Sequence, residues 1–189
     1  MEKNDARLYR ITRPIITVLF KFFFRPTIKG VENISDGKLV LAGNHTSILD
    51  CLLLISSTKR SIHFLAKKEL WGFPKNIIFS HMGLIPVDRS IHDKNALLSA
   101  YEYLNNGSLV LVFPEGTTEK GRGVLPFKIG AVKMASVTNS KITPFIIKGK
   151  YKIFKKSISI EFLKQLTINK DLSEENETLE KIIKKELEG

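Results

Sequence analysis

Residues 39–56 read LVLAGNHTSILDCLLLIS, and this stretch predicts the fold of the chain around it. The apolar run Leu39–Ala42 predicts a buried strand that ends at a glycine and an asparagine. Ser47 is a good N-cap, so we expect a helix over Ile48–Ser56. A strand, a short loop and a helix in this order are typical of α/β proteins, whose ligands bind beyond the carboxyl ends of the strands.

His45 and Asp50 within this stretch are the first candidates for chemistry. We expect His45 on the loop and Asp50 in the first turn of the helix. On one continuous helix the two side chains would point about 140° apart, but a turn between them lets the carboxylate fold back onto the imidazole. That contact would fix the histidine tautomer and leave the other ring nitrogen free as a base. The alternative is an exposed loop histidine beside an aspartate that caps the helix.

A second polar turn follows another apolar run. Leu109–Phe113 predicts a buried strand, and Pro114, Glu115, Gly116 and Thr117 follow it directly. Two strand ends that carry polar side chains are typical of the active site of an α/β enzyme. The alternative for Glu115 is a carboxylate that caps a nearby helix.

The two motifs resemble those of the glycerolipid acyltransferase family, and within it the 1-acylglycerol-3-phosphate acyltransferases. That family has four ordered sequence blocks, and the resemblance covers residues 30–149. The first block, Asn-His-x-Ser-x-x-Asp, is matched by Asn44, His45, Ser47 and Asp50. The second, Gly-x-x-Phe-Ile-x-Arg, is matched in part by Gly83, Val87 and Arg89, with Pro86 at the aromatic position.

The third block, Phe-Pro-Glu-Gly-Thr-Arg-Ser, is matched by residues 113–117, which include Pro114. The fourth is a strand-like run around a proline, matched loosely by residues 142–146. Between these two blocks, Lys128 belongs to a Pro-Phe-Lys run that also resembles the family. The order and spacing of the blocks make a chance match improbable.

The resemblance implies transfer of an acyl group from a thioester to a hydroxyl. His45 would act as the general base, and Asp50 would orient the ring and stabilise the imidazolium. The turn at Glu115, Gly116 and Thr117 would belong to the acceptor site, where Glu115 accepts hydrogen bonds from glycerol hydroxyls. Arg89 would bind the phosphate of the acceptor, for which a bidentate guanidinium is suited. Because the donor is already activated, no ATP is needed and we expect no cofactor. No metal-ligand spacing recurs in the sequence, so we expect no metal either.

Block three departs from the family at two positions. The family has arginine where this chain has Thr118, and serine where it has Glu119. In the family that arginine is associated with the acceptor's phosphate. Arg122 or Lys120 could take its place from the same loop. The alternative is that the acceptor is another lysolipid, such as a lyso-aminolipid.

The N-terminal segment, residues 1–29, is basic and rich in phenylalanine. The first thirty residues hold seven lysines and arginines against two acids, a net charge of +5. The apolar run Ile15–Phe24 is shorter than the roughly 20 residues that span a bilayer, and no signal-peptide pattern accompanies it. We therefore predict an amphipathic helix at the membrane interface, peripheral or monotopic on the cytoplasmic face of the cell membrane. The alternative is a helix that packs on the core and exposes its charges.

The rest of the chain, residues 30–189, predicts one acyltransferase domain. Strands are expected at 61–66, 84–87, 142–147 and 157–162, and helices at 93–105, at 128–138 and after an N-cap at Ser173. The fold class is therefore α/β, with a mixed sheet flanked by helices in a single domain. The histidines His63, His81 and His92 match no block and are interpreted as structural or exposed.

Composition limits the partners. The 189 residues suffice for one domain, and the net charge of +11 indicates an anionic partner. An anionic membrane surface, an acidic acyl carrier protein and the phosphates of an acyl-CoA all fit, so the donor stays open between acyl-ACP and acyl-CoA. No nucleic-acid motif occurs, and we expect no nucleic acid partner. The alternative from another class is a lipid-surface binder without catalysis.

Overall fold

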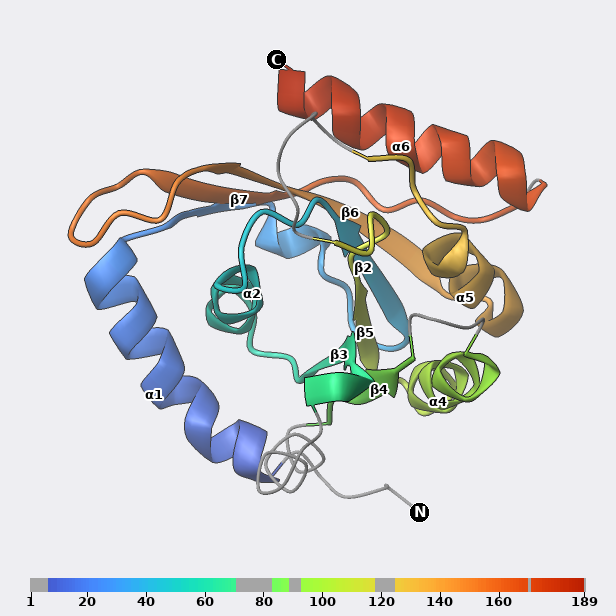
Figure 1. Cartoon of the computed structure of the whole chain (residues 1–189), viewed down its shortest axis with the longest axis horizontal. Coiled ribbons are helices and arrows are strands. Elements are labelled where there is room, and N and C mark those ends of the chain that lie inside the picture. The colour runs from blue at the N-terminus through green and yellow to red at the C-terminus, as the bar shows by residue number, and fades with distance from the viewer. Residues whose placement is uncertain (1–6, 71–82, 89–92, 118–124, 170, 189) are drawn as a thin grey trace.

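The computed structural model describes residues 7–70, 83–88, 93–117, 125–169 and 171–188 (Figure 1). Its α-helices are α1 (Arg7–Phe24), α2 (Asp50–Ser57), α4 (Lys94–Asn105), α5 (Gly130–Thr138) and α6 (Leu172–Glu188). Its strands are β1 (Thr27–Lys29), β2 (Leu39–Gly43), β3 (Ile62–Lys67), β4 (Ile85–Val87), β5 (Leu109–Val112), β6 (Lys141–Gly149) and β7 (Ile158–Phe162). Two short 3₁₀ helices lie at Val31–Asn33 and Lys68–Leu70.

The strands form one mixed sheet in the order β1-β7-β6-β2-β5-β3-β4. All described neighbours pair in parallel except β6 and β7, which form an antiparallel hairpin. Helices α1 and α2 cover one face of this sheet, and α4, α5 and α6 cover the other (Figure 1). The predicted fold, a single α/β domain with helices flanking a mixed sheet, is confirmed.

The central strands are buried on both faces, which explains their unbroken apolar sequence. Along β2, Leu39 and Leu41 belong to the core under α1 and α2, whereas Val40 and Ala42 belong to the core under α4, α5 and α6. All four side chains are 0% exposed. Alternate residues of β5 divide in the same way, so the two adjacent strands contribute to the cores on both faces of the sheet.

Four helices begin at a different residue from the one predicted, including α4, at Lys94 rather than 93, and α5, at Gly130 rather than 128. Helix α2 begins at Asp50 rather than Ile48. The preceding residues form a turn, because the backbone N–H groups of Thr46 and Ser47 donate to the Asp50 carboxylate. Ser47 therefore is not the N-cap; its hydroxyl accepts a hydrogen bond from the Leu49 N–H at 3.3 Å. Helix α6 is capped by Asp171 rather than Ser173, because the Asp171 carboxylate accepts the N–H of Ser173 at 2.8 Å.

The N-terminal segment contains a helix, as predicted, and also a strand that the sequence did not reveal. Strand β1 pairs with β7 at the edge of the sheet. One face of α1 packs on the core, where Tyr9 is 1% and Phe20 is 4% exposed. The other face carries an exposed apolar stripe, made of Ile11, Ile15, Val18, Leu19 and Phe22. None of the described helices is long and apolar enough to cross a membrane.

Strand β4 lies at the opposite edge of the sheet, as the proline within it predicts. Gly83, which precedes it, has a φ of 71°, and a Cβ there would lie 2.5 Å from the Nδ1 atom of His63. That ring contacts the Gly83 carbonyl at 2.9 Å and stacks on Tyr103. Gly83 and His63 therefore hold the sheet edge together, which agrees with a structural role for His63.

Candidate active site

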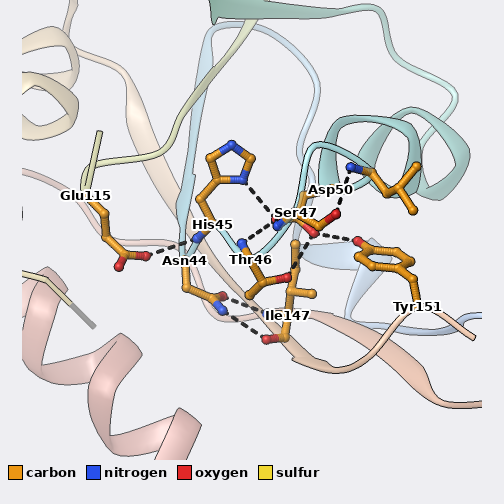
Figure 2. Close-up of polar contacts among 9 residues, drawn as sticks. Asn44, His45, Thr46, Ser47, Asp50, Glu115, Ile147 and Tyr151 are labelled. Carbon is orange, nitrogen blue, oxygen red and sulfur yellow. Dashed lines mark hydrogen bonds and ion pairs between the residues drawn. The ribbon is translucent and has the colours of Figure 1, made fainter. Parts of the chain in front are cut away.

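The imidazole of His45 and the carboxylate of Asp50 form a contact pair at the end of β2. Nδ1 of His45 lies 2.9 Å from Oδ2 of Asp50 (Figure 2). The loop between β2 and α2 turns the carboxylate back onto the ring, as the spacing of the two residues predicts. The His45 side chain is 12% exposed and that of Asp50 is 0% exposed, so the pair lies at the base of the loop with the ring reaching outward.

The Asp50 carboxylate accepts hydrogen bonds from five donors. Oδ2 accepts from His45 Nδ1 and from the backbone N–H groups of Thr46 and Ser47, at 2.9, 2.5 and 2.8 Å. Oδ1 accepts from the hydroxyls of Thr46 and Tyr151, at 3.2 and 2.5 Å. Burial acts to raise the pKa of Asp50, but these donors outweigh it, and the pKa lies below its ordinary value of 3.8. Asp50 is therefore an ionised acceptor at neutral pH, which requires that His45 donate from Nδ1 and leaves Nε2 as the basic atom.

The turn after β5 packs directly against His45. Because β2 and β5 are parallel neighbours, their carboxyl ends meet at the same edge of the sheet. The Phe113 ring stacks on the imidazole with centroids 3.8 Å apart and planes 8° from parallel. Oε1 of Glu115 accepts the backbone N–H of His45 at 3.0 Å, and Oε2 accepts that of Leu125 at 3.1 Å. The Glu115 carboxylate therefore joins the His45 loop to the segment at Leu125, rather than capping a helix.

Asn44 holds the other side of the histidine loop. Its side-chain amide donates to the Ile147 carbonyl at 2.9 Å and accepts the Ile147 N–H at 2.8 Å (Figure 2). Asn44 is 5% exposed, so this pair of hydrogen bonds is buried and joins the loop to β6. Asn44, the first residue of the first block, therefore anchors the loop that carries His45.

Gly116 allows the turn after β5 to approach Lys128. Its φ is 70°, and a Cβ at this position would lie 3.2 Å from Nζ of Lys128. The N–H of Gly116 donates to the Phe113 carbonyl, and the N–H of Lys128 donates to that of Pro114, both at 3.0 Å. An exposed ammonium group therefore lies beside this turn. Thr117 follows the turn as a half-buried residue.

Two predicted site residues, Arg89 and Arg122, lie outside the described residues, and so does Thr118 with its altered block position. Gly83 lies in the described part but contacts β3, at the sheet edge, rather than the His45 loop. Cys51, next to Asp50, packs against the core under α1 and α2. Burial raises the pKa of its thiol to about 12, so it is a protonated structural side chain rather than a nucleophile.

Tyr151 was not predicted from the sequence. This residue follows β6, 101 positions after the aspartate that its hydroxyl contacts. Burial and the hydrogen bond to Asp50 raise the pKa of this hydroxyl above its ordinary value of 10.0, so it remains the donor. On its other side the Tyr151 ring contacts Phe20 and Phe24 of α1, with centroids 6.1 and 5.7 Å away. No local pattern marks the residue, because its partners come from two distant segments.

A match to a family model identifies the family of the chain. The family model described as acyltransferase matches residues 25–148, a span that contains all four blocks. The chain belongs to the acyltransferase family. This confirms the resemblance, and it places the His45–Asp50 pair, the Glu115 turn and Lys128 inside the matched region.

Several relatives of the chain are named 1-acyl-sn-glycerol-3-phosphate acyltransferases. A chloroplastic 1-acyl-sn-glycerol-3-phosphate acyltransferase of Arabidopsis thaliana is 35% identical over 69% of this chain and 38% of its own length. An enzyme of the same name from Borreliella burgdorferi is 33% identical over 69% of this chain and 54% of its own. The chain thus matches about half or less of these relatives' lengths.

A solved structure with low sequence identity to this chain has the same fold. The crystal structure of the 1-acyl-sn-glycerophosphate acyltransferase of Thermotoga maritima superposes with a TM-score of 0.75. It covers 97% of this chain and 78% of its own, at 23% identity. The shared architecture therefore extends from α1 to α6, beyond the region matched by the family model.

Proposed function

We propose that the chain transfers a fatty acyl group from an acyl thioester to the free hydroxyl of 1-acylglycerol-3-phosphate, giving phosphatidic acid. The observation that supports this most is the His45–Asp50 pair, whose 2.9 Å contact lies in a loop built by the first block. The names of the relatives support the choice of acceptor. The donor is an acyl-ACP or an acyl-CoA, and the product belongs to phospholipid biosynthesis.

The reaction needs a base and a stabilised intermediate. Nε2 of His45 takes the proton as the acceptor oxygen attacks the thioester carbonyl, and Asp50 stabilises the imidazolium that forms. When the intermediate collapses, the carbon–sulfur bond breaks and His45 returns the proton to the leaving thiolate. The products are the new ester and a free thiol. The stacked ring of Phe113 restricts rotation of the imidazole, so the base is held in one orientation.

The acceptor binds at the turn after β5. Each carboxylate oxygen of Glu115 already accepts one backbone N–H and keeps further lone pairs for a glycerol hydroxyl. Lys128, beside Gly116, is a described cation placed to attract the acceptor's phosphate. Arg89 and Arg122, which lie outside the described residues, are proposed for the same role from the sequence alone. Lys128 itself matches the family pattern, so Arg122 or Lys120 remains the proposed replacement for the arginine that block three lacks at Thr118.

The lipid substrate requires access from a membrane surface. The exposed apolar stripe of α1, next to exposed Lys21 and Arg25, is suited to the interface of an anionic membrane. We place the protein peripherally on the cytoplasmic face of the cell membrane. We therefore propose that both interpretations of this helix hold: α1 packs on the core with one face and contacts lipid with the other.

An acyl-transfer assay tests the proposal. Purified protein is given acyl-ACP and acyl-CoA in parallel, with lysophosphatidic acid and other lysolipids as acceptors. We expect phosphatidic acid from lysophosphatidic acid, and a raised KM for this acceptor in Lys128→Ala with little change in kcat. Transfer only to another lysolipid would keep the mechanism and contradict the acceptor. No transfer from either donor to any acceptor would contradict the enzyme itself.

Tyr151→Phe is expected to lower kcat roughly tenfold while leaving KM for both substrates unchanged, because it removes a charge-assisted hydrogen bond from Asp50. Without this donor the His45–Asp50 pair holds its proton more tightly, so the acid limb of kcat/KM against pH moves to higher pH. Tyr101→Phe, on α4, is the matched control. An unchanged pH profile in Tyr151→Phe would show that the hydroxyl does not act through Asp50.

A further inference from the structure

The loop between β6 and β7 exposes two large apolar side chains at its tip. Ile153 is 59% and Phe154 is 51% exposed, although the loop is closed by a hydrogen bond from the Lys150 N–H to the Ser157 carbonyl. Phe154 has a φ of 60°, a conformation that few residues other than glycine adopt. The loop therefore holds its apolar tip outward in a defined conformation.

This tip is attached to the C-terminal end of α1. The Phe154 N–H donates to the Phe23 carbonyl at 2.5 Å. The Phe154 ring lies 5.7 Å from that of Phe22 and 5.6 Å from that of Phe23, measured between centroids. Figure 1 shows the loop beside the end of α1. The tip thus extends the exposed apolar stripe of α1 into one continuous surface, which we call the docking surface.

Positive charge surrounds the loop part of the docking surface. Between residues 150 and 156 the chain has no acidic residue and four exposed lysines, namely Lys150, Lys152, Lys155 and Lys156. Apolar tips ringed by lysines suit a membrane, where the side chains enter the acyl boundary and the ammonium groups reach anionic headgroups. A second copy of the chain fits less well, because a two-fold interface would bring these lysines against one another.

We propose that the β6–β7 loop is a second membrane-inserting element, in which Ile153 and Phe154 enter the interface of an anionic lipid membrane beside α1. The inference deepens the proposed function and rests on it for the membrane partner. The same loop carries Tyr151, whose hydroxyl contacts Asp50. Insertion of the loop therefore sets the height of the His45–Asp50 pair above the lipid surface, where a lysolipid headgroup would meet it.

The first test places a fluorescent probe at the tip. Phe154→Trp in the full chain is mixed with phosphatidylcholine vesicles, with and without phosphatidylglycerol, that carry brominated acyl chains. Wild-type protein supplies the background of its single tryptophan, Trp71. We expect a blue shift and quenching at position 154 on the anionic vesicles. Val137→Trp, at a 59% exposed position of α5 on the opposite face of the sheet, should show neither.

The second test removes the apolar tip. Ile153→Ser with Phe154→Ser should weaken binding to anionic vesicles at least about tenfold, from the loss of buried apolar area. The matched control, Leu98→Ser with Val137→Ser, changes two equally exposed side chains and should bind as the wild type does. Transfer to a short-chain lysolipid dispersed as monomers should be the same in all three proteins.

The outcomes separate the loop from the activity. Vesicle binding without quenching at position 154, or without loss in the serine variant, would overturn the inference and leave the proposed acyl transfer intact. Quenching at position 154 in a protein that transfers no acyl group would support membrane insertion of the loop and contradict the proposed function. Binding equal on neutral and anionic vesicles would overturn the role of the lysines.

Discussion

His45→Ala is expected to lower kcat/KM for acyl transfer by about 10³-fold, within the range that general base catalysis contributes. The loss corresponds to about 4 kcal/mol of transition-state stabilisation. The reason is that Nε2 of His45 is the basic atom of the pair, since Nδ1 is committed to Asp50 at 2.9 Å. Steady-state rates with saturating thioester, at several acceptor concentrations, measure the effect and separate kcat from KM.

A matched variant separates loss of the base from loss of packing. His45→Gln keeps a side chain under the Phe113 ring and a donor toward Asp50 but removes the basic nitrogen. We expect it to be as inactive as His45→Ala, with vesicle binding unchanged in both. If either variant kept more than about a tenth of the wild-type kcat, the base would have to be another group, since a single base supplies at least about a hundredfold.

Asp50→Asn is expected to lower kcat/KM by about 10³–10⁴-fold, because a neutral amide no longer stabilises the imidazolium. The overall geometry should survive: the amide oxygen can replace Oδ2, and the amide nitrogen can donate to the Thr46 and Tyr151 hydroxyls. KM should change little, since Asp50 is 0% exposed and does not reach the substrate. The same steady-state assay measures both constants.

The same substitution should also change stability against pH. The pKa of Asp50 is lowered in the folded protein, so the unfolded chain binds its proton first as the pH falls. The stability that Asp50 contributes is therefore present above its ordinary value of 3.8 and is lost as the pH drops below it. Urea unfolding across this range should show a shallower acid dependence in Asp50→Asn. An equal dependence in both proteins would mean that Asp50 does not titrate differently on folding.

Much of the fold was predictable because its signals are local. Continuous apolar runs at Leu39–Ala42 and Leu109–Phe113 indicated buried strands, and both are strands with two buried faces. The break at Gly43 and the five-residue spacing from His45 indicated a turn that returns Asp50 to the ring. The predicted first residue of α2 was wrong for an equally local reason. The Asp50 carboxylate accepts backbone N–H groups of the turn that Ser47 was expected to end as the N-cap.

Local sequence patterns were enough to predict most strands and helices, the His45–Asp50 pair, the Glu115 turn and the amphipathic N-terminal helix. The tertiary structure was needed to place β2 beside β5, which brings Glu115 to the His45 backbone, and to bring Tyr151 to Asp50. It also decided that the β6–β7 loop meets the end of α1. Hydropathy and turn chemistry act over a few residues. These contacts depend instead on the order of strands in the sheet, which brings together residues as distant in the sequence as Phe23 and Phe154, 131 positions apart.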